Sequence, residues 1–410
     1  MKSLAIPFGS GFNFHLAKTK SPGLISLMPL VSLGSFATVF LTPVFPEISK
    51  YFNITTAVTQ VMMVMLLLGY TVGPIFGAPV ANRFGRKKAA YLSVFLYFLG
   101  TVLIISGINI HLFIILLIGC FVITMGGGSA MTLAYVIIHD YFSHEQAKIV
   151  TSYMMIAFSL IPAFSICITG FLATNFGWES CLYALFAYGF LVLFVILILP
   201  ETITRINRKS LNLIWIYKKY IRCLKNPRLI IFSLIFGLAS SCIYVIPTIA
   251  PFISVNMLKI TPEEYGLYLL FAYLGQFIGG YTSGKLQTKL SANRLMLTGG
   301  SITLTGALIM FILFSMGSVN IISLFGPMFL IMCGTPLIYG ATSAKAVLGQ
   351  KDKSSASAAM LLISMFLISC VSLGIVFLDL QTALFLPGLI FILMFVTIIL
   401  TIVGNRIYKG

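Results

Sequence analysis

Long apolar runs separated by short polar gaps fill the chain. Each run is close to the ~20 residues that cross the hydrocarbon core of a bilayer as an α-helix. Twelve runs can be marked, at 24–45, 57–78, 89–106, 112–136, 150–173, 180–200, 229–252, 264–284, 294–315, 320–342, 354–378 and 382–404. The pattern predicts an all-α membrane protein with twelve transmembrane helices.

Lysine and arginine residues gather in alternate gaps between these runs. Of the 26 basic residues, 24 lie on the side of the predicted membrane that holds both chain ends, and only Lys50 and Lys259 lie on the other. Basic loops are retained on the cytoplasmic side, so this asymmetry predicts that both termini are cytoplasmic.

The longest polar gap divides the predicted helices into two sets of six, and the two sets echo each other. Gly69, Gly73 and Gly77 recur at a spacing of four, and about half a chain later come Gly275 and Gly279, then Gly280 and Gly284. Such glycines let helix backbones approach closely in lipid, and duplicated units form pseudo-symmetric bundles. The expected organisation is a cytoplasmic tail at 1–23, a six-helix bundle at 24–200, a basic cytoplasmic linker at 201–228, a second six-helix bundle at 229–404 and a cytoplasmic tail at 405–410.

Composition narrows the class of protein further. Hydrophobic residues make up 59% of the chain and charged residues 9%, with a mean hydropathy of +1.05, whereas charged residues make up about a quarter of soluble domains. The net charge of +17 lies at helix ends, so we expect anionic lipid headgroups rather than nucleic acid as its partner. The chain has no phosphate-binding loop and no recognisable metal-ligand spacing, so neither a cofactor nor a metal is expected.

The gap between the second and third runs contains a dense motif. It runs from Gly77 to Lys88 as GAPVANRFGRKK and resembles motif A of the major facilitator superfamily. The resemblance implies the twelve-helix fold of that family. It also implies a role in conformational gating, through contacts across the two halves, for Gly77, Asn82, Arg83, Gly85, Arg86 and Lys87. Asn82 stands where the family has an acid, and an amide accepts hydrogen bonds without supplying the full charge of a salt bridge.

Other segments resemble the Bcr/CflA-type drug-efflux branch of the same superfamily. They are TPVFPEI at 42–48, Asp140 at the end of the fourth run, and LPET at 199–202. In the fifth run, Pro162 and Gly170 resemble part of the antiporter motif C, with Ile166 in place of its second proline. The resemblance implies efflux of drugs across a bacterial inner membrane.

Two departures from that branch concern proton coupling. Val39 stands where the branch has an acid in the first helix, and Cys120 where it has the motif B arginine. A charged group near mid-membrane costs on the order of 3 kcal/mol or more, so one is kept there only for a task. None of the nine acidic residues lies near the middle of an apolar run. The candidates for proton coupling are therefore Glu47 and Asp379 at outer helix ends, and His139 with Asp140 at the inner end of the fourth run.

Uncharged side chains at mid-membrane depth outline an expected substrate path. They are Ser35, Thr38, Thr124, Phe158, Tyr244, Tyr273, Gln276 and Ser364. Hydroxyls, amides and aromatic rings offer hydrogen bonds and stacking without fixed charge. This set favours a neutral or amphipathic organic ligand.

The features together predict a monomeric secondary transporter that exports lipophilic or amphipathic small molecules by alternating access. An uncoupled or differently coupled metabolite carrier or importer of the same fold is the alternative. A membrane-embedded enzyme is a remote one, because the sequence lacks catalytic motifs and its acids are peripheral.

Overall fold

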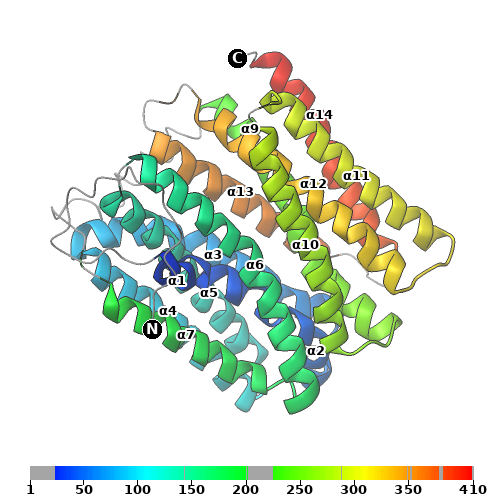
Figure 1. The fold of residues 1–410 in the computed structure, drawn as a ribbon. Helices are drawn as coiled ribbons and strands as arrows, with labels where there is room; N and C mark the ends of the chain where they lie inside the picture. Colours follow the sequence, from blue (N-terminus) through cyan, green and yellow to red (C-terminus); the bar gives the residue numbers. More distant parts are fainter. Residues whose placement is uncertain are drawn as a thin grey trace, which may run out of the picture.

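The computed structural model describes residues 24–142, 144–199, 201, 225–287, 289–348, 350, 353–377 and 382–408. Most of the 201–228 linker, both chain ends and Asp379 lie outside these residues, as do the side chains of His139 and Phe158. Throughout the described residues the regular structure is helical, without strands (Figure 1).

The first half of the chain contains α1 Leu24–Phe40, the short 3₁₀ helix η1 Thr42–Val44, α2 Phe45–Phe52, α3 Thr56–Phe84, α4 Arg86–Asn109, α5 Phe113–Tyr141, α6 His144–Phe176 and α7 Ser180–Ile198. The second half contains α9 Pro227–Phe252, the π-helical turn η2 Ile253–Met257, α10 Pro262–Leu286, α11 Ala292–Ser315, α12 Ile321–Val347, α13 Lys353–Val376 and α14 Phe385–Ile407. Each predicted run therefore corresponds to a long helix.

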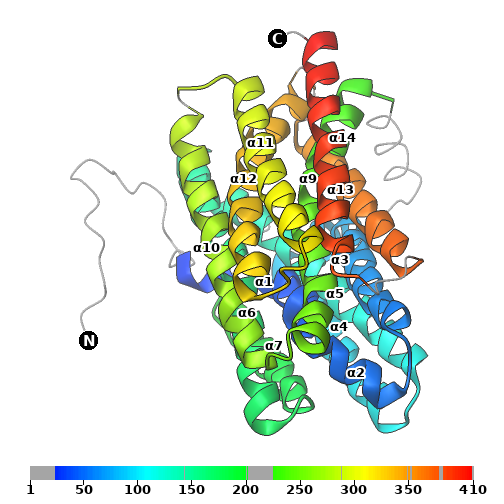
Figure 2. The ribbon, with the colours of Figure 1, turned by 90° about the vertical axis from the view of Figure 1, so that its right-hand side faces the viewer.

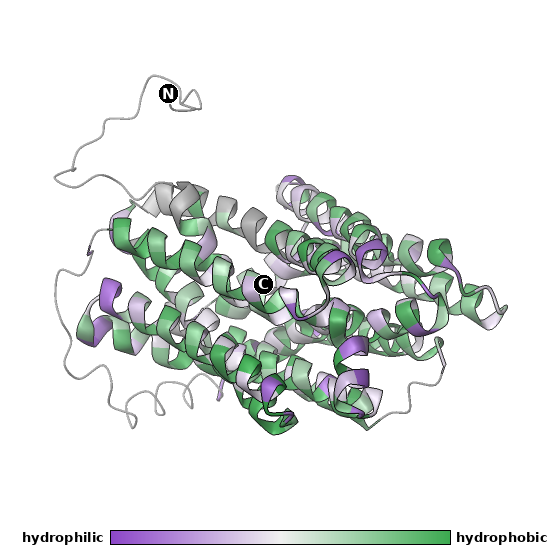
Figure 3. Ribbon diagram, turned by 90° about the horizontal axis from the view of Figure 1, so that it is seen from below, coloured by the Kyte–Doolittle hydropathy of each residue, from purple (hydrophilic) through white to green (hydrophobic). Residues whose placement is uncertain are grey.

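These helices make the chain an all-α, multi-pass membrane protein, as predicted. Within the described residues, ten helical spans are long and apolar enough to cross a bilayer, and the apolar part of α6 at Leu160–Phe176 is shorter. The more polar α10 completes the set of twelve. Hydrophobic residues dominate along the helices when the molecule is coloured by hydropathy (Figure 3).

The first span differs from its predicted bounds. The apolar run was expected to end at residue 45, but the helical path continues through η1 and α2 to Phe52. Pro43 and Pro46 each lie in the first turn of a new helical segment, where a missing N–H group costs no intrahelical hydrogen bond. The prolines thus divide the span without ending it, and Glu47 lies in the first turn of α2, near the outer end of the span.

Two hydrophobic cores correspond to the two halves of the chain. One core is built almost entirely from residues of α1 to α7, and the other from residues of α9 to α14. In Figure 1 the blue-to-green helices lie beside the yellow-to-red helices as two bundles. Equivalent helix pairs pack in each half: α3 and α4 pack on α5, and α10 and α11 pack on α12.

The glycine ladders lie at these equivalent contacts, as the sequence predicts. A methyl group on Gly73 would meet the Ser129 nitrogen of α5 at 2.8 Å, and one on Gly279 would meet the Cys333 carbonyl carbon of α12 at 2.9 Å. Close backbone contact of this kind supports helix association where lipid removes the hydrophobic driving force. Gly280 and Gly284 face open space, so only part of the second ladder is an interface.

Two helix pairs join the halves. α6 packs on α10, and α3 packs on α13, while η1 and α2 also contact α9. The molecule has two ends (Figure 2). We call the end with Arg86, Arg228 and Lys345 the basic end, and the end with Glu47 and Glu263 the acidic end.

Candidate functional site

The motif A segment forms a bonded network around Arg86 at the basic end. The buried Arg86 side chain donates from Nε to Asp140 Oδ2 at 2.8 Å. Its Nη1 donates to Asn82 Oδ1 and to the Ala81 carbonyl, each at 3.0 Å. Asn82 therefore supplies an acceptor for Arg86, while the charge opposite Arg86 comes from Asp140 on α5.

Glu201 joins the motif A segment to the end of α7. Its carboxylate accepts hydrogen bonds from the backbone N–H groups of Arg86 at 2.8 Å and Lys87 at 3.1 Å. These groups begin α4, where unpaired N–H groups and the helix dipole favour an anion. In return, Lys87 Nζ donates to the Leu197 carbonyl at 3.0 Å, near the end of α7. The two helix ends thus cap each other.

Gly85 is required by this arrangement. It has a φ of +104°, which L-residues with side chains rarely adopt. A methyl group there would also approach Glu201 Oε2 at 2.7 Å. Gly77 packs against Ser129 of α5, and the exposed Arg83 guanidinium lies 5.5 Å from the centre of the Phe84 ring.

The described hydrogen bonds and ion pair of the motif A network all remain within the first half and the residue that follows it. The motif resemblance implied contacts across the halves, whereas the hydrogen bonds of Arg86 and Lys87 described above connect the motif to α5 and to the end of α7. The sequence motif named six residues of the segment from Gly77 to Lys88. Their partner Glu201 was noted only as part of the LPET segment at 199–202.

The halves meet through hydrogen bonds between α6 and α10 towards the acidic end. The Glu263 N–H donates to Thr174 Oγ1 at 3.2 Å, and Asn175 Nδ2 donates to Glu263 Oε2 at 3.3 Å. Deeper in the pair, Cys167 Sγ donates to the Gly266 carbonyl at 3.1 Å. We call these residues the α6–α10 latch.

Small residues allow this close approach of α6 and α10. Gly170, singled out for its likeness to an antiporter motif, lies where a methyl group would meet Glu263 Cα at 3.0 Å. A methyl group on Gly266 would meet Cys167 Cα at 3.1 Å. Pro162 of the same motif lies further back in α6, where its carbonyl accepts a hydrogen bond from Ser165 at 2.8 Å.

Tyrosines from both halves gather around Tyr244 of α9. Tyr70 of α3, Tyr273 of α10 and Tyr339 of α12 each lie within electrostatic range of the Tyr244 phenol, and Tyr135 of α5 lies within range of Tyr70. We call these five residues the tyrosine cluster. It brings phenol groups of both bundles together.

Two members of the tyrosine cluster also form hydrogen bonds with residues outside the cluster. Tyr70 donates to the Met131 sulfur at 2.9 Å, and Tyr339 is in hydrogen-bonding contact with Ser240 and Thr335. Tyr135, Tyr244 and Tyr339 are half-buried, which leaves part of each ring accessible. The group can therefore offer both hydroxyls and aromatic faces to a ligand.

The expected substrate-path residues separate into two kinds. Ser35, Thr38, Thr124 and Ser364 are buried and donate to backbone carbonyl groups at 3.2 Å or less, so their hydroxyls are already hydrogen-bonded within the protein. By contrast, Tyr244 and Tyr273 belong to the tyrosine cluster. Gln276 is one turn from Tyr273 on the same helix face, and its buried Oε1 has no hydrogen-bond partner among the described residues.

The structure adds Tyr70, Tyr135 and Tyr339 to the residues named from sequence. Each lies in an apolar helix that also holds other aromatic residues, so position along the chain alone does not distinguish it. The distinguishing feature is the shared face between the halves, which requires the packing of α3, α5, α9 and α12.

The positions considered for proton coupling have different surroundings in the structure. Val39 and Cys120, at the usual coupling positions, are buried and uncharged at 3% and 0% exposure. Asp140 is paired with Arg86. Glu47 is partly buried, and its Oε2 is covered without a hydrogen-bond partner among the described residues.

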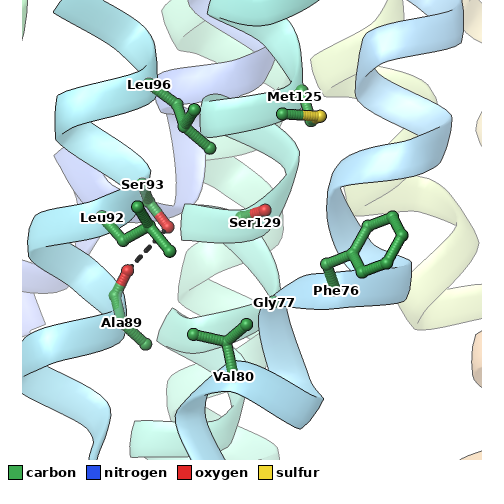
Figure 4. A pocket seen from close by; sticks show the side chains of 9 residues that line it. All are labelled: Phe76, Gly77, Val80, Ala89, Leu92, Ser93, Leu96, Met125 and Ser129. Atoms are coloured by element: carbon green, nitrogen blue, oxygen red, sulfur yellow. Dashed lines mark hydrogen bonds between the residues drawn. The ribbon is translucent and has the colours of Figure 1, made fainter. Parts of the chain in front are cut away.

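A separate pocket lies on the outside of the first half. It measures about 170 Å³ and lies between α3, α4 and α5 (Figure 4), lined by Phe76, Gly77, Val80, Ala89, Leu92, Ser93, Leu96, Met125 and Ser129. Phe76 and Leu92 are 42% and 44% exposed, which places the pocket at the lipid-facing surface. It receives no residue from the second half and is distinct from the tyrosine cluster.

Comparisons with known proteins agree with this architecture. The family described as the Major Facilitator Superfamily matches residues 27–360. A bicyclomycin resistance protein homolog of Haemophilus influenzae is 23% identical over 276 residues, 67% of each chain, and multidrug resistance protein D of Escherichia coli is 23% identical over 158 residues, 38% of this chain and 39% of that one. A D-xylose-proton symporter structure superposes with a TM-score of 0.75 at 13% identity, covering 93% of this chain and 96% of the other.

Proposed function

The chain belongs to the major facilitator superfamily, and on that premise we propose that it exports lipophilic or amphipathic small molecules by alternating access. Members of this family are secondary transporters, not a class of enzyme. Efflux is the function we favour within it because relatives that match the chain are a bicyclomycin resistance protein homolog and a multidrug resistance protein.

The tyrosine cluster is the observation that supports this proposal best. A ligand held by both Tyr135 and Tyr244, which are partly accessible, would contact both halves, so its binding would change as the halves rock about it. The nearest charged residue in each of the contributing helices is more than one helical turn away. Uncharged hydroxyls and rings suit a neutral or amphipathic organic molecule.

We propose that the α6–α10 latch closes the acidic end in the arrangement described here. The described hydrogen bonds between the halves lie in this pair. The positive-inside rule assigns the basic end to the cytoplasm, so the latch would be the outer gate of a monomeric protein in a bacterial inner membrane, with both termini cytoplasmic. The motif A network would then hold one gating state at the inner side.

Coupling to protons is proposed to involve Glu47. η1 and α2 contact α9 of the other half, and the covered Glu47 Oε2 has no described hydrogen-bond partner. Parting of the halves at the acidic end would bring this oxygen into contact with water, which links proton binding to the conformational change. Asp140, paired with Arg86, is assigned to the motif A network, while Asp379 lies outside the described residues.

An uncoupled carrier or importer of the same fold is the second candidate function. The uncharged Val39 and Cys120 favour it. Each stands where the Bcr/CflA-type efflux branch, which the chain resembles, has a charged group for proton coupling.

Transport by the purified protein in liposomes tests the proposed function. We expect lipophilic dyes to be transported. For a dye that can form a hydrogen bond with a tyrosine hydroxyl, we expect Tyr244→Phe and Tyr339→Phe each to slow transport about fivefold, which corresponds to the loss of one neutral hydrogen bond. Tyr183→Phe is the matched control because Tyr183 is 75% exposed on α7. Transport of no lipophilic compound in either direction would contradict the efflux function and favour metabolites as substrates.

A further inference from the structure

Two cations meet in an aromatic corner at the basic end of the second half. Arg228 begins α9, and its Nε donates to the Lys345 carbonyl of α12 at 3.2 Å. The Lys345 Nζ donates to Asn405 Oδ1 of α14 at 2.9 Å. Tyr408 and Phe232 form the walls, with the Arg228 guanidinium 5.8 Å from the Tyr408 ring centre and Lys345 Nζ 5.5 Å from that of Phe232. We call these five residues the α9–α12–α14 corner.

The corner carries positive charge that no described acid balances. Lys345 is only 6% exposed, and the Arg228 Nη2 atom is covered without a hydrogen-bond partner in the part of the chain that the structure describes. Asp140 and Glu201 at this end belong to the motif A network of the other half, and Glu145 lies in the first turn of α6, also in the other half. Burial of an unpaired charge is costly, and here two like charges lie close together.

We propose that the α9–α12–α14 corner binds a phosphate group, presented by an anionic phospholipid headgroup at this end of the protein. Nothing in the transport function requires this site, so it stands apart from the proposed substrate path. Arg228 is partly exposed and is the side chain that a ligand would reach first, while the buried Lys345 behind it adds charge.

The chemistry of the corner favours phosphate oxygens. A guanidinium forms paired hydrogen bonds to phosphate, and such bonds are stronger than those between neutral groups. Aromatic walls exclude water from one side and strengthen the electrostatic attraction. α14 lies on the outside of the bundle beside α9 at this end (Figure 2), where a lipid headgroup can approach from the bilayer surface.

Stabilisation by lipid tests the site. The melting temperature of the full-length purified protein in detergent would be measured with added phosphatidylglycerol, phosphatidylcholine or inorganic phosphate. We expect phosphatidylglycerol to raise the melting temperature more than phosphatidylcholine, and Arg228→Gln to weaken this response about tenfold in lipid concentration. Lys345→Met should act in the same direction. Arg406→Gln is the matched control, because Arg406 is an exposed arginine on α14, the helix that contributes Asn405 to the corner.

The arms of the experiment separate the sources of the phosphate and the competing partner. Protection by inorganic phosphate that Arg228→Gln removes supports the phosphate site with a soluble source in place of the lipid. An equal response to phosphatidylglycerol in the wild type and Arg228→Gln, or an equal loss in Arg406→Gln, overturns the proposal. Asp352, outside the described residues, is the acid nearest to Lys345 in sequence. A lipid response that appears only in Asp352→Asn would make that carboxylate the occupant and also overturn it.

Discussion

At the scale of single residues, Gly85 has the strictest backbone requirement in the motif A segment. Its φ of +104° and the Glu201 carboxylate beside it leave no room for a side chain. We expect Gly85→Ala to lower the free energy of unfolding by about 1–3 kcal/mol, the cost of a backbone conformation that is essentially restricted to glycine. Thermal unfolding of the purified protein measures it. Gly280→Ala should be neutral or stabilising, because Gly280 is helical and faces open space; equal loss in both variants would refute the conformational argument.

The Arg86–Asp140 pair gives a second prediction at this scale. Asp140→Asn leaves the buried Arg86 without its counter-charge, and we expect a loss of about 1.5–3 kcal/mol, typical of a hydrogen bond to a charged group. Asn82 Oδ1 already contacts Arg86 Nη1 at 3.0 Å, so adding Asn82→Asp should restore much of the stability. Melting temperatures of the two single variants and the double variant decide the matter. No recovery in the double variant would mean that Asn82 and Asp140 do not share Arg86.

Single residues were predictable where the chain carries a local motif. Arg86 and Asn82 follow from GAPVANRFGRKK, because a short loop keeps its residues close together whatever the rest of the fold does. Tyr339 was not predictable in this way. Its contact with Tyr244 joins α9 to α12, and no local signal records such a distant pairing.

At the scale of helices, positions along the chain were predictable but faces were not. Membrane helices need long apolar runs, so their number and order follow from hydropathy. Lipid is as apolar as a protein core, so the outward face carries no polar signal. In α7, Phe190 and Phe194 are 59% and 63% exposed while Val192 and Ile196 are fully buried. Both pairs look alike in sequence, and only packing separates them.

The α6–α10 pair yields a prediction at this scale. A methyl group on Gly266 would already meet Cys167 Cα at 3.1 Å, so we expect Gly266→Val to push the two helices apart and weaken the α6–α10 latch. Hydrogen exchange followed by mass spectrometry should show faster exchange in the 169–176 and 262–270 segments. Gly284→Val, at an open position of the same helix, should leave these segments unchanged. Unaltered exchange in Gly266→Val would show that the contact does not hold the acidic end closed.

At the scale of the whole molecule, the two-bundle architecture follows from sequence more readily than the conformation does. The glycine ladders and alternating basic loops recur in both halves. A transporter that alternates between states has one sequence for all of them, so the hydrogen bonds that join Glu263 to Thr174 and Asn175 could not be anticipated. Energy coupling could not be predicted from the sequence for a similar reason. Glu47 differs from the other acids in that its Oε2 is covered by the folded protein, and its neighbours in the sequence do not indicate this.

The proposed coupling of proton movement to the conformational change is therefore tested by substituting Glu47. In liposomes with an imposed pH gradient, we expect dye transport by the wild type to respond to the gradient. Glu47→Gln should transport dye down its own gradient while losing the response to pH, because its side chain binds no proton as the acidic end opens and closes. Glu179→Gln is the matched control, since Glu179 is exposed at the same end. A wild type that ignores the gradient would favour the uncoupled carrier suggested by Val39 and Cys120. A gradient response retained in Glu47→Gln would leave coupling with another group, because the proposed link requires that carboxylate to exchange a proton when the α6–α10 latch opens.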